Sequence, residues 1–389
     1  GNRMTAILAG ALVYTFSGSM YVMFMEMNFL NFFYLFPLLM IGVEYLWTGK
    51  GHKLFVISFA LCLINSYYYA YMMALQVVVY CVVRYIIERK IIPFKELMKL
   101  VGRFFICAVI GGVIGLASQL PAIVNVLSLG RFKYEEDIKI FSLEAGLPVI
   151  LQMFSIYIVI AGFVGFSSMA IVAFALILRK KSSSHKLAAV LFVIYSLSFF
   201  FPIIASAFNA GNYATLRYAF AYPMLAGYIL TLGFDELPSL KKKSWMIALI
   251  AAFVYLVAIV YFSSGKDGFY SALSLLMSVL LVGAANSIWG ERNRKAVTIT
   301  YFAAILFSCF MIGFACIRVY VVSVSVPFGK VNDIFLYSEG KPLLDEERLT
   351  QVRYDRVGAD YYGVRVNSSM ALAINGCDFY NSNYNEYVD

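Results

Sequence analysis

The residues best suited to bind an anion lie in a short polar segment, 208–217. This segment contains Asn209 and Asn212, ends in Arg217, and separates two long apolar runs. An arginine that opens an apolar run needs water or a partner, because a bare charge in hydrocarbon is costly. The planar fork of its guanidinium matches the oxygens of a phosphate group. We therefore expect Arg217 to bind a phosphate, with Asn209 and Asn212 completing a polar site.

A second arginine, Arg131, also follows an apolar run and is predicted to lie on the same side of the membrane. Arg217 and Arg131 together could hold a lipid-linked phosphate or pyrophosphate. The alternative is that each side chain only reaches the lipid headgroups, as arginines at a membrane surface commonly do. The neighbouring asparagines favour a ligand at Arg217, whereas both interpretations stay open for Arg131.

Glu26 is the weak candidate for a general base. It lies in a turn, 24–28, whose other residues are Phe, Met and Asn. A lone carboxylate in apolar surroundings is the kind of group whose proton affinity proteins tune for acid–base catalysis. The alternative is that Glu26 simply faces water.

The polar break at 65–69 divides the apolar stretch 54–87. Basic residues flank both ends of this stretch, so an even number of membrane crossings is expected between them. This predicts a short helical hairpin with Asn65, Tyr67 and Tyr68 at its tip. The tip could be part of the tyrosine belt that anchors proteins at the headgroups. It could instead line an outward-facing cavity.

The composition is that of a membrane protein. Of the 389 residues, 62% are hydrophobic and 14% are charged, against about one quarter charged in soluble domains. The net charge of +9 does not indicate nucleic-acid binding, because the basic residues fall between apolar runs. No cofactor is expected, and no metal site, since His52 and His185 lie in separate loops. The sequence has no phosphate-binding glycine loop and no hydrolase or zinc-protease motif.

The apolar runs predict an all-α polytopic bundle of about 11 transmembrane helices, since about 20 apolar residues cross a bilayer. Most of the 31 Lys and Arg residues lie between alternate pairs of runs. Cytoplasmic loops carry this excess of positive charge, so the start of the chain is predicted to be cytoplasmic and its tail extracellular. The predicted runs are 4–24, 29–47, 54–65, 68–87, 104–127, 157–178, 187–208, 217–234, 244–263, 269–289 and 296–318.

Two domains are predicted. Residues 1–319 form the transmembrane domain, and residues 320–389 the start of a β-rich extracellular domain, because apolar and polar residues alternate there between Gly and Asn breaks. The chain begins at Gly1 and stops within a strand-like run, so we expect it to be a fragment of a longer protein.

Two smaller patterns concern helix packing. Residues 88–103 place apolar side chains at helical spacing among basic ones, which predicts an amphipathic helix on the inner membrane surface. The alternative is a plain solvated linker. Gly111 and Gly115 are four residues apart, with Gly112 beside them. Small residues at this spacing let helices approach closely, so these glycines are predicted to be structural.

The order and spacing of several short segments resemble the YfhO family of bacterial membrane proteins. The segments are 14–18, 36–39, 42–44, 65–71, 119–121 with Ser128 and Arg131, 209–220 with Arg217, 233–235, and 361–384 with Arg365, Asn367, Gly376 and Tyr380.

The resemblance implies a GT-C type membrane glycosyltransferase in the bacterial plasma membrane. Such an enzyme takes a sugar from a polyprenyl-phosphate donor at the outer face and passes it to an envelope polymer such as lipoteichoic acid. It uses an Asp or Glu in the first outer loop. This sequence opens at what resembles a later helix, so that acid is expected upstream of Gly1, and Glu26 is not the obvious base.

Two other functions stay open. A transporter or flippase of a lipid-linked precursor would need polar residues deep in the bundle, where the sequence offers few charges beyond Glu44. A non-catalytic envelope adaptor would depend on the tail, 320–389, and not on Arg217. All three functions involve membrane lipid as a partner, and none involves nucleic acid.

Overall fold

The computed structural model describes residues 3–24, 30–89, 92–128, 138–153, 164–211, 213–239, 242–262, 266–316, 353–354 and 375–376. Nearly all of these residues are helical. The α-helices are α1 Arg3–Thr15, α2 Gly18–Phe24, α3 Phe32–Trp47, α4 Lys53–Asn65, α5 Tyr67–Glu88, α6 Phe94–Ser128, α7 Leu143–Gln152, α8 Met169–Ile177, α9 Ser183–Ser198, α10 Pro202–Phe208, α11 Ala221–Gly233, α12 Lys242–Phe262, α13 Lys266–Ile288 and α14 Arg294–Cys316. The 3-10 helices are η3 Leu216–Phe220, η4 Phe234–Ser239 and η5 Gly290–Asn293.

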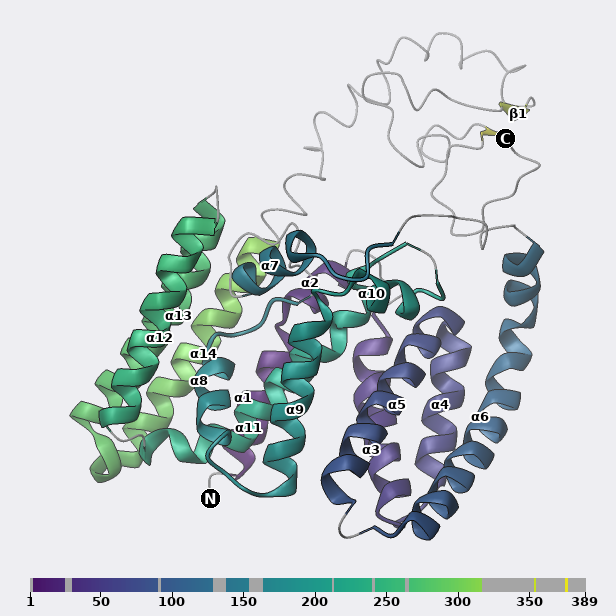
Figure 1. Cartoon of the computed structure of the whole chain (residues 1–389), viewed down its shortest axis with the longest axis horizontal. Coiled ribbons are helices and arrows are strands. Elements are labelled where there is room, and N and C mark those ends of the chain that lie inside the picture. The colour runs from purple at the N-terminus through teal and green to yellow at the C-terminus, as the bar shows by residue number, and fades with distance from the viewer. Residues whose placement is uncertain are drawn as a thin grey trace. The chain divides into compact units, whose positions relative to one another are not determined.

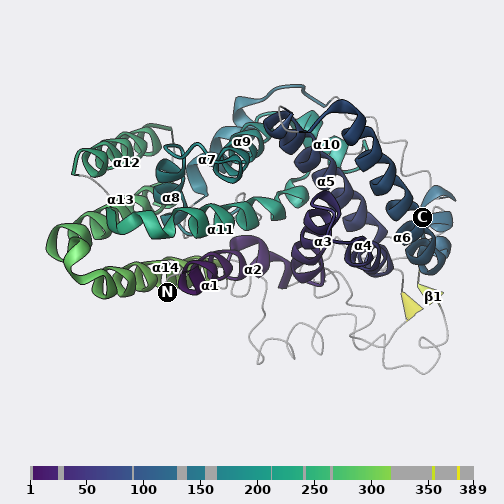
Figure 2. The same ribbon diagram turned by 90° about the horizontal axis from the view of Figure 1, so that it is seen from below.

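The chain divides into two compact units. The first comprises residues 1–119 and 134–320, and the second comprises 120–133 and 321–389. In the first unit, α3 to α6 gather at one end and α12 to α14 at the other, with α1, α8, α9 and α11 between them (Figures 1 and 2).

Helix α11 lies in the core of the first unit. Its residues Tyr222, Ala226, Ile229 and Leu230 are fully buried. Against it packs α1, at a point where two glycines face each other. A Cβ atom added to Gly10 would lie 2.4 Å from the carbonyl oxygen of Gly227. The two backbones can approach this closely only because neither residue has a side chain.

The membrane class predicted from the sequence agrees with the helices observed. Among the described residues, three helical segments are long and apolar enough to cross a membrane: Tyr67–Glu88, Phe94–Leu120 and Arg294–Gly313. Helices α9 and α10 would make a fourth span if the pair, bent by 103°, is one crossing. Five further apolar helices have only 10–17 residues, so the count of eleven spans stays a prediction.

Several predicted runs are divided in the structure. The run 187–208 is broken after Ser198, and α10 begins at Pro202. Proline has no backbone N–H, and its ring clashes with the carbonyl four residues earlier, so it disfavours continuation of the preceding helix. The run 4–24 is broken between Thr15 and Gly18. By contrast, the break at 65–67 is confirmed, because α4 ends at Asn65 and α5 begins at Tyr67, with the Ser66 side chain capping α5.

The helix predicted within 88–103 is confirmed from Phe94 onward, where α6 begins and continues into the predicted span without interruption. Its place on the inner membrane surface stays a prediction. The packing role of its glycines is confirmed, since a Cβ atom on Gly115 would lie 2.5 Å from the Leu63 Cβ of α4. Nothing lies within 4 Å of the corresponding position on Gly112.

In the second unit, the described strands are β1, Arg353–Tyr354, and β2, Asn375–Gly376, which pair in parallel. Most of the tail lies outside the described residues. The β-rich extracellular domain therefore stays a prediction.

Candidate functional site

A polar cluster at the start of α5 joins residues that lie far apart in the sequence. The Tyr68 hydroxyl donates to Asn209 Oδ1 at 2.9 Å, and Arg217 Nη1 lies 3.5 Å from the same hydroxyl. The Arg217 guanidinium carbon is 5.8 Å from the centre of the Tyr68 ring. The structure therefore brings together three of the residues that the sequence analysis selected.

The local fold fixes Asn209 and Arg217. Asn209 caps the C-terminus of α10, is 5% exposed, and donates from Nδ2 to the Tyr213 carbonyl at 2.9 Å. The chain then turns through Ala210 and Gly211, whose φ angles are 54° and 84°. Such positive φ angles suit glycine and are uncommon for alanine. The side chain of Thr215 then caps η3, which carries Arg217 in its first turn.

Arg217 has no carboxylate partner within the described ranges. Its side-chain hydrogen bond and its cation–π contact are both with Tyr68, and the Nε and Nη2 atoms have no hydrogen bond to the described residues. The residue is half-buried. A guanidinium with two unused donor atoms at an accessible position can bind an oxyanion bidentately.

Closely packed aromatic side chains lie next to this cluster. The Phe32 and Tyr69 rings stack at 4.4 Å between centroids, and Phe32 lies 4.6 Å from Phe220. These three side chains are at most 1% exposed. Because these rings cannot move without opening the core, they fix the positions of α3, α5 and η3 relative to one another.

The remaining sequence-selected residues are placed differently. Asn65 accepts a hydrogen bond at 2.6 Å from Asn31 Nδ2, a partner that the sequence analysis missed. Tyr67 begins α5 next to Tyr68. Glu26, Arg131 and Asn212 lie outside the described residues, so their predicted roles stay predictions.

A buried polar chain continues from this cluster into the bundle. Gln76 Nε2 donates to the Tyr218 carbonyl at 2.7 Å, and the Tyr195 hydroxyl donates to Gln76 Oε1 at 3.1 Å. The hydroxyls of Ser198 and Tyr218 lie 2.9 Å apart. Sequence reasoning found no polar residues of this depth, because Gln76 and the tyrosines are scattered singly through apolar runs.

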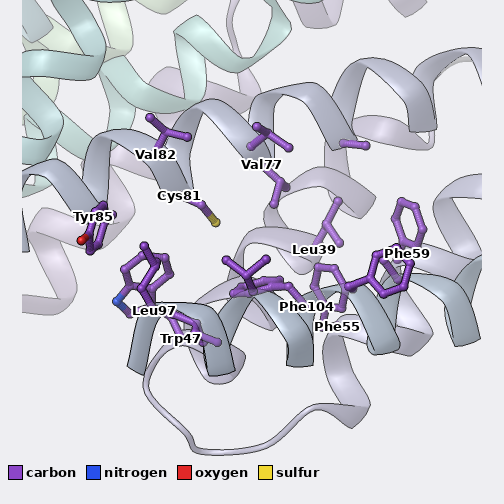
Figure 3. A pocket seen from close by; sticks show the side chains of 16 residues that line it. Leu39, Trp47, Phe55, Phe59, Val77, Cys81, Val82, Tyr85, Leu97 and Phe104 are labelled. Atoms are coloured by element: carbon purple, nitrogen blue, oxygen red, sulfur yellow. The ribbon is translucent and has the colours of Figure 1, made fainter. Parts of the chain in front are cut away.

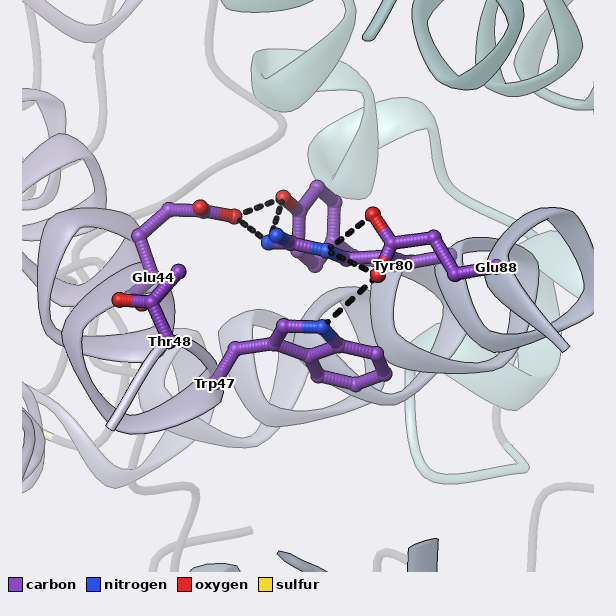
Figure 4. Close-up of polar contacts among 6 residues, drawn as sticks. Glu44, Trp47, Thr48, Tyr80 and Glu88 are labelled. Atoms are coloured by element: carbon purple, nitrogen blue, oxygen red, sulfur yellow. Dashed lines mark hydrogen bonds and ion pairs between the residues drawn. The ribbon is translucent and has the colours of Figure 1, made fainter. Parts of the chain in front are cut away.

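A second polar cluster lies at the other end of α5 (Figure 4). Arg84 is paired through Nη1 with Glu44 of α3 and through Nε with Glu88, 3.3 Å away. The Trp47 ring lies 4.9 Å from the Arg84 guanidinium, and its Nε1 donates to Glu88 at 3.1 Å. Tyr80 donates to Glu44 as well.

Two cavities accompany these clusters, and neither is lined by Arg217 or Tyr68. One, of about 460 Å³, lies between α3, α4, α5 and α6 and is lined by apolar side chains such as Leu39, Phe55 and Phe104 (Figure 3). The residues that line it include no cationic side chain to pair with a phosphate. The other, of about 440 Å³, is lined partly by Glu44 and Arg84. Among the described residues no group of His, Cys, Asp and Glu could hold a metal ion.

Apolar helices of membrane-spanning length, with charges confined to their ends, define a polytopic membrane protein. The family described as "Bacterial membrane protein YfhO" matches residues 2–389, and the chain belongs to this family. A protein of Bacillus subtilis (strain 168) named "Uncharacterized protein YfhO" is 26% identical over 359 residues. That alignment covers 90% of this chain but 40% of the relative, so the chain spans less than half of the relative's length. No solved structure matches this chain.

Proposed function

We propose that the chain is part of a membrane glycosyltransferase that moves a sugar from a polyprenyl-phosphate donor to an extracellular envelope polymer such as lipoteichoic acid. The observation that carries the proposal is Arg217, a half-buried guanidinium that contacts Tyr68 but no described carboxylate. A charge in that position gains most from an anionic ligand. The donor phosphate supplies such an anion together with a lipid anchor that keeps it at the membrane surface.

In the proposed reaction, the oxygen of an acceptor hydroxyl forms a bond to the anomeric carbon of the sugar. The bond between that carbon and the phosphate oxygen breaks, and polyprenyl phosphate leaves with an additional negative charge. Arg217 stabilises this charge, which is greater in the transition state than in the bound donor. A carboxylate takes the hydroxyl proton.

Tyr68 and Asn209 act as positioning residues in this proposal. The Tyr68 hydroxyl contacts both Arg217 and Asn209, so it restrains the guanidinium through Nη1. A restrained guanidinium binds phosphate with a smaller loss of side-chain entropy. Arg131 and Asn212 would add further contacts to the donor.

The test is the Arg217→Ala variant of the full-length protein in a bacterium whose envelope polymer carries the sugar. Loss of the sugar with unchanged protein abundance is expected, because the donor phosphate loses its counter-charge. The matched control is Arg294→Ala, which removes an exposed guanidinium bonded only to the Asp235 carbonyl among the described residues. Normal decoration in the Arg217 variant would refute the assignment.

The buried polar chain through Gln76 favours one other function, transport of a lipid-linked precursor between leaflets. Gln76 is 2% exposed and connects α5 with α9 and η3. Polar side chains of this depth are costly in a membrane and commonly serve a pathway. Following a fluorescent lipid-linked sugar in reconstituted vesicles separates the two functions, since a transferase alone leaves the probe in its original leaflet.

A further inference from the structure

The cavity of about 440 Å³ lies between α3, α5, α9 and α11. Its polar lining includes Glu44, Arg84, Glu88 and Tyr228, and its apolar lining includes Met40 and Leu191. Helix α5 separates this polar group from the Arg217 cluster. Tyr68 and Arg84 are 16 residues apart, which corresponds to about 24 Å along a helix. On the topology predicted from the basic residues, this cavity belongs to the cytoplasmic end of the bundle.

The charges that line this cavity do not cancel. They are two carboxylates, from Glu44 and Glu88, and one guanidinium, from Arg84. Arg84 bonds to both carboxylates and its side chain is only 11% exposed. With one positive and two negative groups, the lining carries a formal charge of −1 and favours a cation.

Glu44 has the carboxylate that is open to a ligand. Its side chain is 40% exposed, against 19% for Glu88. Arg84 and Tyr80 both bond to Oε1 of Glu44, while Oε2 has no hydrogen bond to any residue in the described part of the chain. An ionised oxygen next to hydrocarbon is stabilised by a hydrogen-bond donor, above all by a charged one.

We infer that this cavity is a binding site for a primary ammonium group attached to an apolar body. The ammonium has three N–H donors. One fits Glu44 Oε2, and the hydroxyls of Ser183, Ser184 and Tyr228, which also line the cavity, can accept the others. Phe36, Met40 and Leu187 provide apolar walls for the attached body. The inference does not depend on the proposed glycosyltransferase function, because it concerns different residues.

Such an ammonium could come from the headgroup of an aminophospholipid or from a free amine. Both share the chemistry that Glu44 recognises. A quaternary ammonium of the same charge lacks the N–H donors, so the hydrogen bonds to Glu44 distinguish the two kinds of headgroup. Phosphatidylcholine is therefore the matched comparison for phosphatidylethanolamine.

The experiment uses the full-length protein in nanodiscs that contain equal amounts of phosphatidylethanolamine and phosphatidylcholine. Native mass spectrometry then counts the lipids that stay bound on release from the disc. We expect wild-type protein to retain phosphatidylethanolamine about tenfold better, and Glu44→Gln to lose that preference, because a charge-assisted hydrogen bond is removed. In phosphatidylcholine discs, hexylamine is added as the free-amine probe.

Controls separate a loss of binding from a loss of folding. Glu96→Gln removes an exposed carboxylate paired with Lys99 and should keep the preference. Tyr228→Phe leaves the ion pairs intact and should weaken the preference about threefold. Binding of hexylamine that depends on Glu44, without retention of phosphatidylethanolamine, would identify a free amine as the ligand. The inference is overturned if neither amine binds, or if Glu44→Gln, with an unchanged melting temperature, binds as wild type does.

Discussion

The Tyr68 hydroxyl lies 3.5 Å from Arg217 Nη1, although 149 residues separate the two in the sequence. This contact joins the first turn of α5 to the 3-10 helix η3. It places the guanidinium beside an aromatic ring instead of a carboxylate, and so leaves its charge uncompensated by the described residues. The proposed donor site follows from this relationship.

Tyr68→Phe should weaken donor use without removing it. The substitution deletes hydrogen bonds to Arg217 and Asn209 but keeps the ring against which the guanidinium lies. Each hydrogen bond contributes about 0.5–1.5 kcal/mol, so we expect the KM for the lipid donor to rise about fivefold. Steady-state transfer with purified protein measures this KM.

Tyr71→Phe is the control, since the Tyr71 hydroxyl bonds to the Ala207 carbonyl of α10. Equal effects of both variants would mean that the Tyr68 hydroxyl acts only on packing.

Gly115→Ala should destabilise the bundle. The added methyl group would lie 2.5 Å from the Leu63 Cβ and 2.9 Å from the Ala60 carbonyl. Overpacking of this kind costs about 1–3 kcal/mol. Gly112→Ala, three residues earlier on the same helix, meets nothing within 4 Å and should leave stability unchanged. Reversible unfolding in mixed detergent micelles measures both variants, and equal stabilities would show that α6 does not depend on this approach to α4.

Arg84→Met should destabilise the protein more than the triple variant that also carries Glu44→Gln and Glu88→Gln. The single change leaves two carboxylates without their shared partner. An uncompensated charge costs about 3–5 kcal/mol when fully buried, and the 40% exposure of the Glu44 side chain reduces this cost, whereas the triple variant has no charge left in the cluster. Thermal unfolding of the purified protein checks the order. If the triple variant were the less stable, the ion pairs themselves would be the source of stability.

Charge and hydropathy predicted the parts of the fold that depend on the membrane. The hairpin break at 65–67 followed from basic residues at both ends of the stretch, and the close packing of α6 against another helix followed from the spacing of Gly111 and Gly115. Both are confirmed. Hydropathy could not locate the bend between α9 and α10, because Phe199, Phe200 and Phe201 continue the apolar run across it. Pro202 was the local signal.

The candidate site was predictable only in part. Arg217, Asn209 and Tyr68 could be selected because polar residues beside apolar runs are conspicuous. Their mutual contacts depend on how α5 and η3 pack, which no local pattern specifies. The same holds for Glu44. The i, i+4 spacing of Arg84 and Glu88 is readable in the sequence, but the pairing of Arg84 with Glu44, 40 residues away, is set by the packing of α3 on α5.

The most direct test of the proposed donor site is sugar transfer in vitro. Full-length protein in nanodiscs is given a polyprenyl-phosphate donor with a radiolabelled sugar and the isolated envelope polymer. We predict transfer by wild-type protein and by Arg294→Ala, and a loss of about a hundredfold in Arg217→Ala, comparable to removing an oxyanion-stabilising donor. Transfer by Arg217→Ala at the wild-type rate would contradict the assignment of Arg217 to the donor phosphate.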